Sequence, residues 1–150
     1  MFKKLGLMII VVLMMTIALV ACGDEAAVVP TYSGASTVTL PDSLKTQMET
    51  SMGANVKNAK IEAFKTSDDA AKVKTSLADG FKKNGWDDKS TDLGATGTEM
   101  DKIGAFAMLY QKGTNAAGVI GFPGSIAGAM GFAGATEKDT VYIIASGASK

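Results

Sequence analysis

The sequence predicts an α+β fold, in which a mostly antiparallel sheet carries two main helices packed on one face. Three observations lead to this prediction. Two segments in the first half of the chain have apolar residues at helical spacing, several short segments alternate or are rich in β-branched residues, and most of these strand-like segments lie late in the chain. Strands that follow one another with short turns pair antiparallel and leave the helices to cover the sheet.

Five segments have the composition of strands. The stretch DTVYIIAS, at 139–146, is the most strand-like of them, and GAFAMLYQK, at 104–112, places Phe106, Met108 and Tyr110 on one face. The turn signal Gly113-Thr114-Asn115 predicts that 104–112 forms a hairpin with the segment that follows. The predicted strands are 36–40, 59–66, 104–112, 117–122 and 139–146.

The first predicted helix begins at Pro41-Asp42, with Asp42 as its N-cap, and ends at Gly53. Leu44, Met48 and Met52 recur every four residues and form a narrow apolar stripe, which we interpret as core.

The second predicted helix lies within SDDAAKVKTSLADGFKKNGW, at 67–86. Ser67 is placed to cap it, two aspartates occupy its first turn and two lysines its last, which suits the helix dipole. Gly85 suits the left-handed position after the helix, and Trp86 can fold back on it. The apolar face of this helix consists of Ala70, Val73, Leu77 and Phe81.

Composition excludes several classes of function. The 150 residues suit one domain. The chain has neither histidine nor arginine, so the usual general base and the bidentate anion fork are missing. A single cysteine excludes an intrachain disulfide and a thiolate zinc cluster. Without residues 1–21, 13 lysines face 15 acidic residues, a net charge of −2, so we expect no nucleic-acid partner.

The N-terminus has the pattern of an export signal. Lys3 and Lys4 precede the apolar run from Leu5 to Val20, which is shorter than the roughly 20 residues of a bilayer span. The following Leu19-Val20-Ala21-Cys22 resembles the lipobox of bacterial lipoproteins. That resemblance implies cleavage between Ala21 and Cys22, and acylation of the Cys22 sulfur.

The chain therefore divides into a signal peptide at 1–21, a lipidated N-terminus with a flexible tether at 22–35, and one α+β domain at 36–150. Gly23 stands where an inner-membrane retention signal of lipoproteins has aspartate. The resemblance thus implies the cell envelope, and the outer membrane where the cell has two membranes.

A second resemblance covers the helix at 67–86. The spacing of Asp69, Val73 and Gly85-Trp86 resembles a D-x-x-x-V…K-K-x-G-W segment of small bacterial envelope lipoproteins. The chain departs from that pattern at Ser76-Leu77, where those proteins often have Phe-Tyr. The resemblance implies an α+β domain and no particular activity.

The stretch GVIGFPGSIAGAMGFAGA, at 118–135, allows three interpretations. Its uncharged surroundings are long enough for a membrane span, and its six glycines suit a phosphate loop. Pro123 and the glycines weaken a helix, however, and the lysine and Ser/Thr of a phosphate loop are missing. We predict instead a strand and a short apolar helix or turn that pack on the sheet. An exposed apolar patch of Ile126, Met130 and Phe132 is the alternative.

In one polar segment the oxygen-bearing side chains are spaced as in a calcium-binding loop. Oxygen-bearing side chains occupy positions 1, 3, 5, 9 and 12 from residue 88, but Leu93 replaces the glycine of the sharp turn, so we expect a solvated loop and no bound metal. The five candidate ligands are Asp88, Ser90, Asp92, Thr96 and Glu99.

Taken together, these features predict a membrane-anchored envelope lipoprotein with a non-catalytic binding or envelope-support domain and no cofactor. Its expected partners are the membrane, through acyl chains on Cys22, and an envelope protein or small ligand. The alternative is a carboxylate- or calcium-dependent enzyme, for which paired acids such as Asp87-Asp88 would serve.

Overall fold

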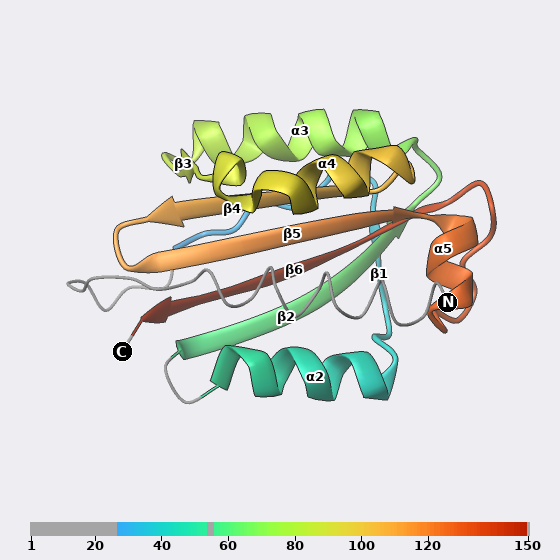
Figure 1. Cartoon of the computed structure of the whole chain (residues 1–150), viewed down its shortest axis with the longest axis horizontal. Coiled ribbons are helices and arrows are strands. Elements are labelled where there is room, and N and C mark those ends of the chain that lie inside the picture. Colours follow the sequence, from blue (N-terminus) through green and yellow to red (C-terminus); the bar gives the residue numbers. More distant parts are fainter. Residues whose placement is uncertain (1–26, 54–55, 150) are drawn as a thin grey trace.

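The computed structural model describes residues 27–53 and 56–149. In these ranges the chain forms a six-stranded sheet with helices packed against it (Figure 1). The elements in chain order are β1 (Ser36–Val38), α2 (Asp42–Met52), β2 (Val56–Thr66), α3 (Ala70–Lys83), β3 (Asp87–Asp88), the 3-10 helix η2 (Ser90–Leu93), α4 (Gly94–Lys102), β4 (Phe106–Lys112), β5 (Asn115–Pro123), α5 (Gly124–Ala129) and β6 (Thr140–Ser149).

The sheet is antiparallel throughout, with the strand order β1-β2-β6-β5-β4-β3. The predicted turn at Gly113 joins β4 and β5 into a hairpin in which Lys112 pairs with Asn115. The last strand, β6, inserts between β2 and β5 and becomes a central strand. The predicted fold class is therefore confirmed, and β3 is a strand that the sequence pattern did not indicate.

Both faces of the central strands are buried, and each face has its own apolar core. On β6, Val141 and Ile143 belong to one core, whereas the alternate residues Tyr142 and Ile144 belong to the other. Helix α2 contributes to the first core through Leu44, Met48 and Met52, and α3 contributes to the second through Val73, Leu77 and Phe81.

The two main helices thus cover opposite faces of the sheet, and the expectation that they share one face is wrong. Strands buried on both faces need cover on both. Figure 1 shows α2 alongside β2 and α3 near β4, toward opposite edges of the sheet.

The helix ends follow the predicted chemistry with two changes. Asp42 is the first residue of α2, and Pro41 takes the N-cap position in its place. Asp69, not Ser67, caps α3, because its carboxylate accepts a hydrogen bond from the Lys72 N–H at 2.8 Å.

The end of α3 is the predicted Schellman motif. The Trp86 N–H donates to the Phe81 carbonyl, and Gly85 has a φ of +74°. The Trp86 ring meets the Phe81 ring edge to face at 5.5 Å.

The polar connection at 87–101 is more ordered than its sequence indicates. It contains β3, η2 and the nine-residue helix α4. The buried side chains of η2 and α4 are Leu93, at the end of η2, and Met100, near the end of α4. Because α4 has so few apolar residues, its sequence shows no apolar repeat at helical spacing that would predict a helix.

The glycine-rich stretch is packing, as predicted. Residues up to Pro123 belong to β5, those from Gly124 to Ala129 form the short helix α5, and Val119, Ile120 and Phe132 are buried. Ile126 and Met130 are partly buried against the same core. Within the described ranges, no helix is long and apolar enough to cross a bilayer.

Two of these glycines are required for close contact. A Cβ on Gly121 would overlap the Phe106 ring, and a Cβ on Gly124 would overlap the Thr136 carbonyl oxygen. Gly128, one turn further along α5, has no such neighbour, because the nearest atom to its Cβ would be the Ala135 carbonyl oxygen at 4.0 Å.

Alanine substitutions at these two α5 positions should have opposite effects. Gly124→Ala should lower the free energy of unfolding by about 1–3 kcal/mol, because a backbone oxygen must move to admit the methyl group. Gly128→Ala should be neutral or raise it by about 0.4–1 kcal/mol, since it restricts only the unfolded chain. Urea denaturation measures both. Equal effects of the two substitutions would show that α5 is not held against the 136–139 turn.

Candidate functional site

The N-terminal segment, residues 27–35, covers the part of one sheet face that no helix covers. Helix α3 contacts β3, β4 and β5, whereas the N-terminal segment lies over β2 and β6. Ala27, Val29 and Ala35 pack against the core of this face, and Tyr32 is buried in it. The expected tether therefore ends before Ala27, and residues 22–26 lie outside the described residues.

Contacts with both the sheet and α3 fix the first half of the N-terminal segment. The Ala27 N–H donates to the Asn115 side chain at 3.4 Å, at the start of β5. The Trp86 indole N–H donates to the Val28 carbonyl at 3.0 Å. Pro30 packs on α3 at Gly80, where a Cβ would come within 3.0 Å of the proline ring.

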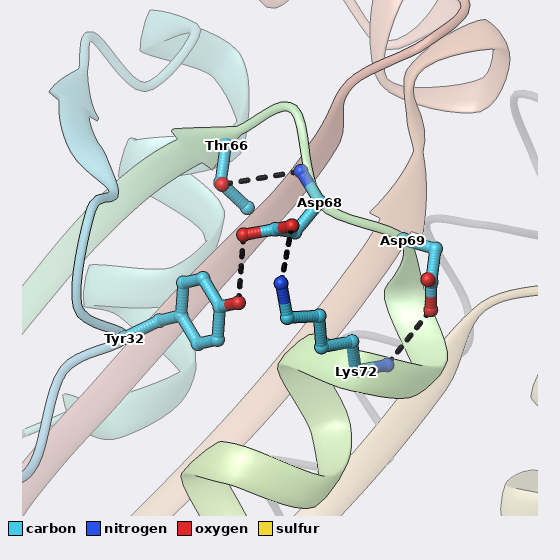
Figure 2. A network of polar contacts seen from close by, with 5 residues as sticks. All are labelled: Tyr32, Thr66, Asp68, Asp69 and Lys72. Atoms are coloured by element: carbon cyan, nitrogen blue, oxygen red, sulfur yellow. Dashed lines mark hydrogen bonds and ion pairs between the residues drawn. The ribbon is translucent and has the colours of Figure 1, made fainter.

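Tyr32 fixes the second half of the N-terminal segment through its backbone N–H and its side-chain hydroxyl. Its N–H donates to the hydroxyl oxygen of Tyr142 at 3.0 Å, in the middle of the sheet. Its own hydroxyl donates to the Asp68 carboxylate at 2.7 Å, and Lys72 donates to the other oxygen of that carboxylate at 2.7 Å. Figure 2 shows the three side chains converging, with the Thr66 hydroxyl accepting the Asp68 N–H.

The ionisation of this cluster follows from its hydrogen bonds. The bonds from Lys72 and Tyr32 lower the pKa of Asp68. The bond to Asp68 raises the pKa of both Tyr32 and Lys72. Burial raises the pKa of Tyr142, which stacks on Phe64 at 5.1 Å. Near neutral pH the cluster therefore holds a carboxylate, an ammonium group and two neutral phenols.

A cavity of about 410 Å³ lies between the N-terminal segment and the sheet. This volume is within the range of small-molecule sites. Its apolar walls come from Phe64, Trp86 and the segment itself, and its polar groups come from strand residues. The lining residues are Ala27, Val28, Val29, Thr31, Asn58, Lys60, Glu62, Phe64, Trp86, Asn115, Ser146 and Gly147.

A β-bulge shapes the floor of this cavity. The pairing of β2 with β6 shifts between Lys57 and Lys60, and Asn58 within the bulge has a φ of +51°. Opposite it, a Cβ on Gly147 would overlap the Val56 side chain, so the two strands approach closely there. The bulge leaves Asn58 and Lys60 lining the cavity, where Lys60 pairs with Glu62 at 3.0 Å.

A second hollow, of about 530 Å³, lies between α3 and the η2–α4 region. Lys74 on α3 and Asp101 on α4 form an ion pair across it at 3.0 Å. Tyr110 lies at its inner wall, stacked on Phe81 at 4.0 Å, and burial raises the pKa of Tyr110 to about 12, with Asp88 and Asp79 adding to the effect.

The structure does not bring the five calcium-loop candidates together. Asp88 and Ser90 line the second hollow, but the Asp88 carboxylate accepts the Ser90 N–H and the Ser90 hydroxyl oxygen accepts the Leu109 N–H. Glu99 pairs with Lys102 on α4. Asp92 and Thr96 do not line the hollow. In residues 27–53 and 56–149, no group of three or more His, Cys, Asp or Glu side chains could hold a metal ion.

The predicted lipidation and cleavage residues, Cys22 and Ala21, lie outside the described residues. No family model matches the chain, and comparisons with curated proteins and with solved structures find no significant match.

Sequence reasoning missed the residues that hold the N-terminal segment. The stretch AAVVPTYSGAS has no period, and its composition is that of a linker. Its one large aromatic residue, Tyr32, is the available signal, because an aromatic side chain in a true linker would expose apolar surface.

The Asp68 cluster predicts loss of stability in acid. Since the folded-state pKa of Asp68 is lowered, its contribution is present above the ordinary value of about 3.9 and is lost as the pH falls through the lowered value. Asp68→Asn should therefore reduce the difference in unfolding free energy between about pH 6 and about pH 3. Asp79→Asn, at an exposed position on the same helix, should leave that difference unchanged. An unaltered acid dependence in Asp68→Asn would contradict the assignment.

Proposed function

We propose that the protein is an envelope lipoprotein, anchored in the membrane by acyl chains on Cys22, whose domain binds a ligand or partner without catalysis. The observation that carries this proposal is the position of the only cysteine, directly after an apolar run and a small residue. One acyl chain binds a membrane marginally, whereas two or three anchor a protein stably. Gly23 favours the outer membrane where two membranes exist.

The packing of the N-terminal segment supports a structural role for the anchor. From Cys22 to the packed residue Ala27 the chain advances five residues, and from Ala27 onward it is hydrogen-bonded to the domain. A pull on the lipid that reaches Ala27 is therefore transmitted to β5 and to Trp86.

The cavity beneath the N-terminal segment supports the binding role. It combines two aromatic walls with amide, hydroxyl and ammonium groups, the usual mixture of small-molecule sites. A carboxylate enzyme needs two acids that face one substrate. The cavity contains one acid, Glu62, already paired with Lys60. The second hollow is lined by Asp79, Asp88 and Asp101, of which Asp101 is paired with Lys74 and Asp88 accepts the Ser90 N–H.

Mass spectrometry of the mature N-terminus tests the anchor. The protein purified from its own envelope should begin at Cys22 and carry the mass of the acyl chains. Cys22→Ser should keep an unacylated N-terminus. Acyl mass that persists in the Cys22→Ser protein, or that is absent from the wild type, would contradict lipid anchoring at Cys22.

Native mass spectrometry of the same preparation tests the cavity. Thr31 is exposed and lines the cavity, whereas Ser33, two residues along, is exposed and does not. A bound mass found in the wild type and in Ser33→Trp should disappear in Thr31→Trp, because the indole occupies the cavity. A bare wild-type mass, or equal retention in both variants, would exclude this cavity as the binding site.

A further inference from the structure

We propose that the end of the sheet formed by Lys57, Asn115 and Lys112 faces the membrane, and that it contacts anionic phospholipid headgroups. This inference rests on anchoring through Cys22. It adds which surface of the domain meets the lipid and therefore where the cavity lies relative to the membrane.

The length of the chain between anchor and domain restricts the orientation. Five extended residues span at most about 17 Å, so Ala27 must lie within that distance of Cys22. Ala27 is bonded to Asn115, the first residue of β5, and β5 runs nine residues, or about 30 Å, to the opposite end. The opposite end therefore cannot face the membrane while Cys22 remains at its surface.

Charge at this end complements anionic lipid. Lys57, Asn115 and Lys112 lie in one row across the sheet, because Lys57 and Asn115 both pair with Ala148 and Asn115 pairs with Lys112. Lys112 also donates to the Asn84 carbonyl at 2.6 Å, which places the exposed Lys82 and Lys83 of α3 at the same end.

Acidic residues at this end are fewer than the lysines, and two of them lie on the edge strand of the sheet. Asp87 and Asp88 are on the edge strand β3, Asp79 is on α3, and Glu62 pairs with Lys60. At the opposite end, the turns that follow β2 and precede β6 carry Asp68, Asp69, Glu137 and Asp139 with one lysine, Lys138, and Asp68 is paired with Lys72 of α3. The charges thus favour the same orientation as the chain length.

An exposed apolar residue marks the same end. Val28 is 73% exposed and follows directly after Ala27. Its carbonyl accepts the Trp86 indole N–H, so the backbone is fixed while the side chain remains uncovered. An uncovered valine beside a lipid anchor can enter the headgroup region, and the cavity that Val28 lines then lies on the membrane side.

The chain has one tryptophan and one cysteine. Trp86 can therefore serve as the fluorescence donor in an energy-transfer test, and Cys22 as the point of attachment to lipid. The mature chain, made without the signal, is coupled through Cys22 to maleimide-bearing lipid in vesicles that contain phosphatidylglycerol and a dansyl-headgroup acceptor. Chemical coupling replaces biological acylation, so a failure of this test and a failure of acylation in the cell are separate results.

Energy transfer from Trp86 to the dansyl headgroups should be high on anionic vesicles, and higher than on purely zwitterionic vesicles. Lys57→Glu/Lys82→Glu should reduce the transfer, because each lysine near an anionic surface contributes about fivefold in affinity. The matched control, Lys102→Glu/Lys138→Glu, changes the net charge equally with exposed lysines away from this end, and should leave the transfer at the wild-type value.

Two results would overturn the proposal. Transfer that is equally low on both kinds of vesicle would show that this end does not meet the lipid. Transfer that falls to the same extent in both double variants would show a response to net charge alone and no preferred face.

Discussion

The structure depends on covering both faces of its central strands. Tyr142 on β6 is fully buried in the core that α3 also covers, but α3 lies mainly over β3, β4 and β5, and the N-terminal segment covers that face over β2 and β6. The bond from the Tyr32 N–H to the Tyr142 hydroxyl satisfies that buried oxygen, and the Tyr32 ring covers the neighbouring apolar surface. Burying a hydroxyl without a partner costs free energy, so the N-terminal segment is part of the domain and not an appendage.

This arrangement links the proposed anchor to the proposed binding site. The N-terminal segment forms one wall of the cavity, the bulged strand β2 forms its floor, and Trp86 both lines the cavity and bonds to the segment. Packing and binding would then use the same nine residues, 27–35, and the anchor on Cys22 would lie five residues before them. A ligand in the cavity would contact the chain directly where it leaves the domain toward the membrane.

The sequence predicted elements well where local chemistry decides the conformation. The α3 ending at Lys82 to Trp86, the stripe of Leu44, Met48 and Met52, and the β4–β5 turn all depend on residues close in the chain, and all are confirmed. It failed where distant residues decide. The placement of α2 and α3 on opposite faces depends on β6 inserting between β2 and β5, a pairing of residues some 80 positions apart that no local pattern records.

The same limit explains the candidate site. Nothing within 27–35 indicates a partner, because Tyr32 is held by Tyr142 and Asp68, which lie 110 and 36 positions away. The calcium-loop spacing, interpreted from the sequence as a solvated loop, shows the opposite case. Its oxygen atoms are close in sequence, but Leu93 is buried and α4 begins within the loop, so the ligands diverge.

Amide hydrogen exchange of the mature chain tests the central claim most directly. If the N-terminal segment is part of the domain, the Tyr32 amide should exchange on the time scale of the β6 amides, because its acceptor is the buried Tyr142 hydroxyl. The Ala35 amide, bonded to the Tyr32 carbonyl at 3.2 Å, should also be protected. Exchange of the Tyr32 amide at the rate of an unstructured peptide, while β6 stays protected, would show that the segment is a free tether and would contradict the account.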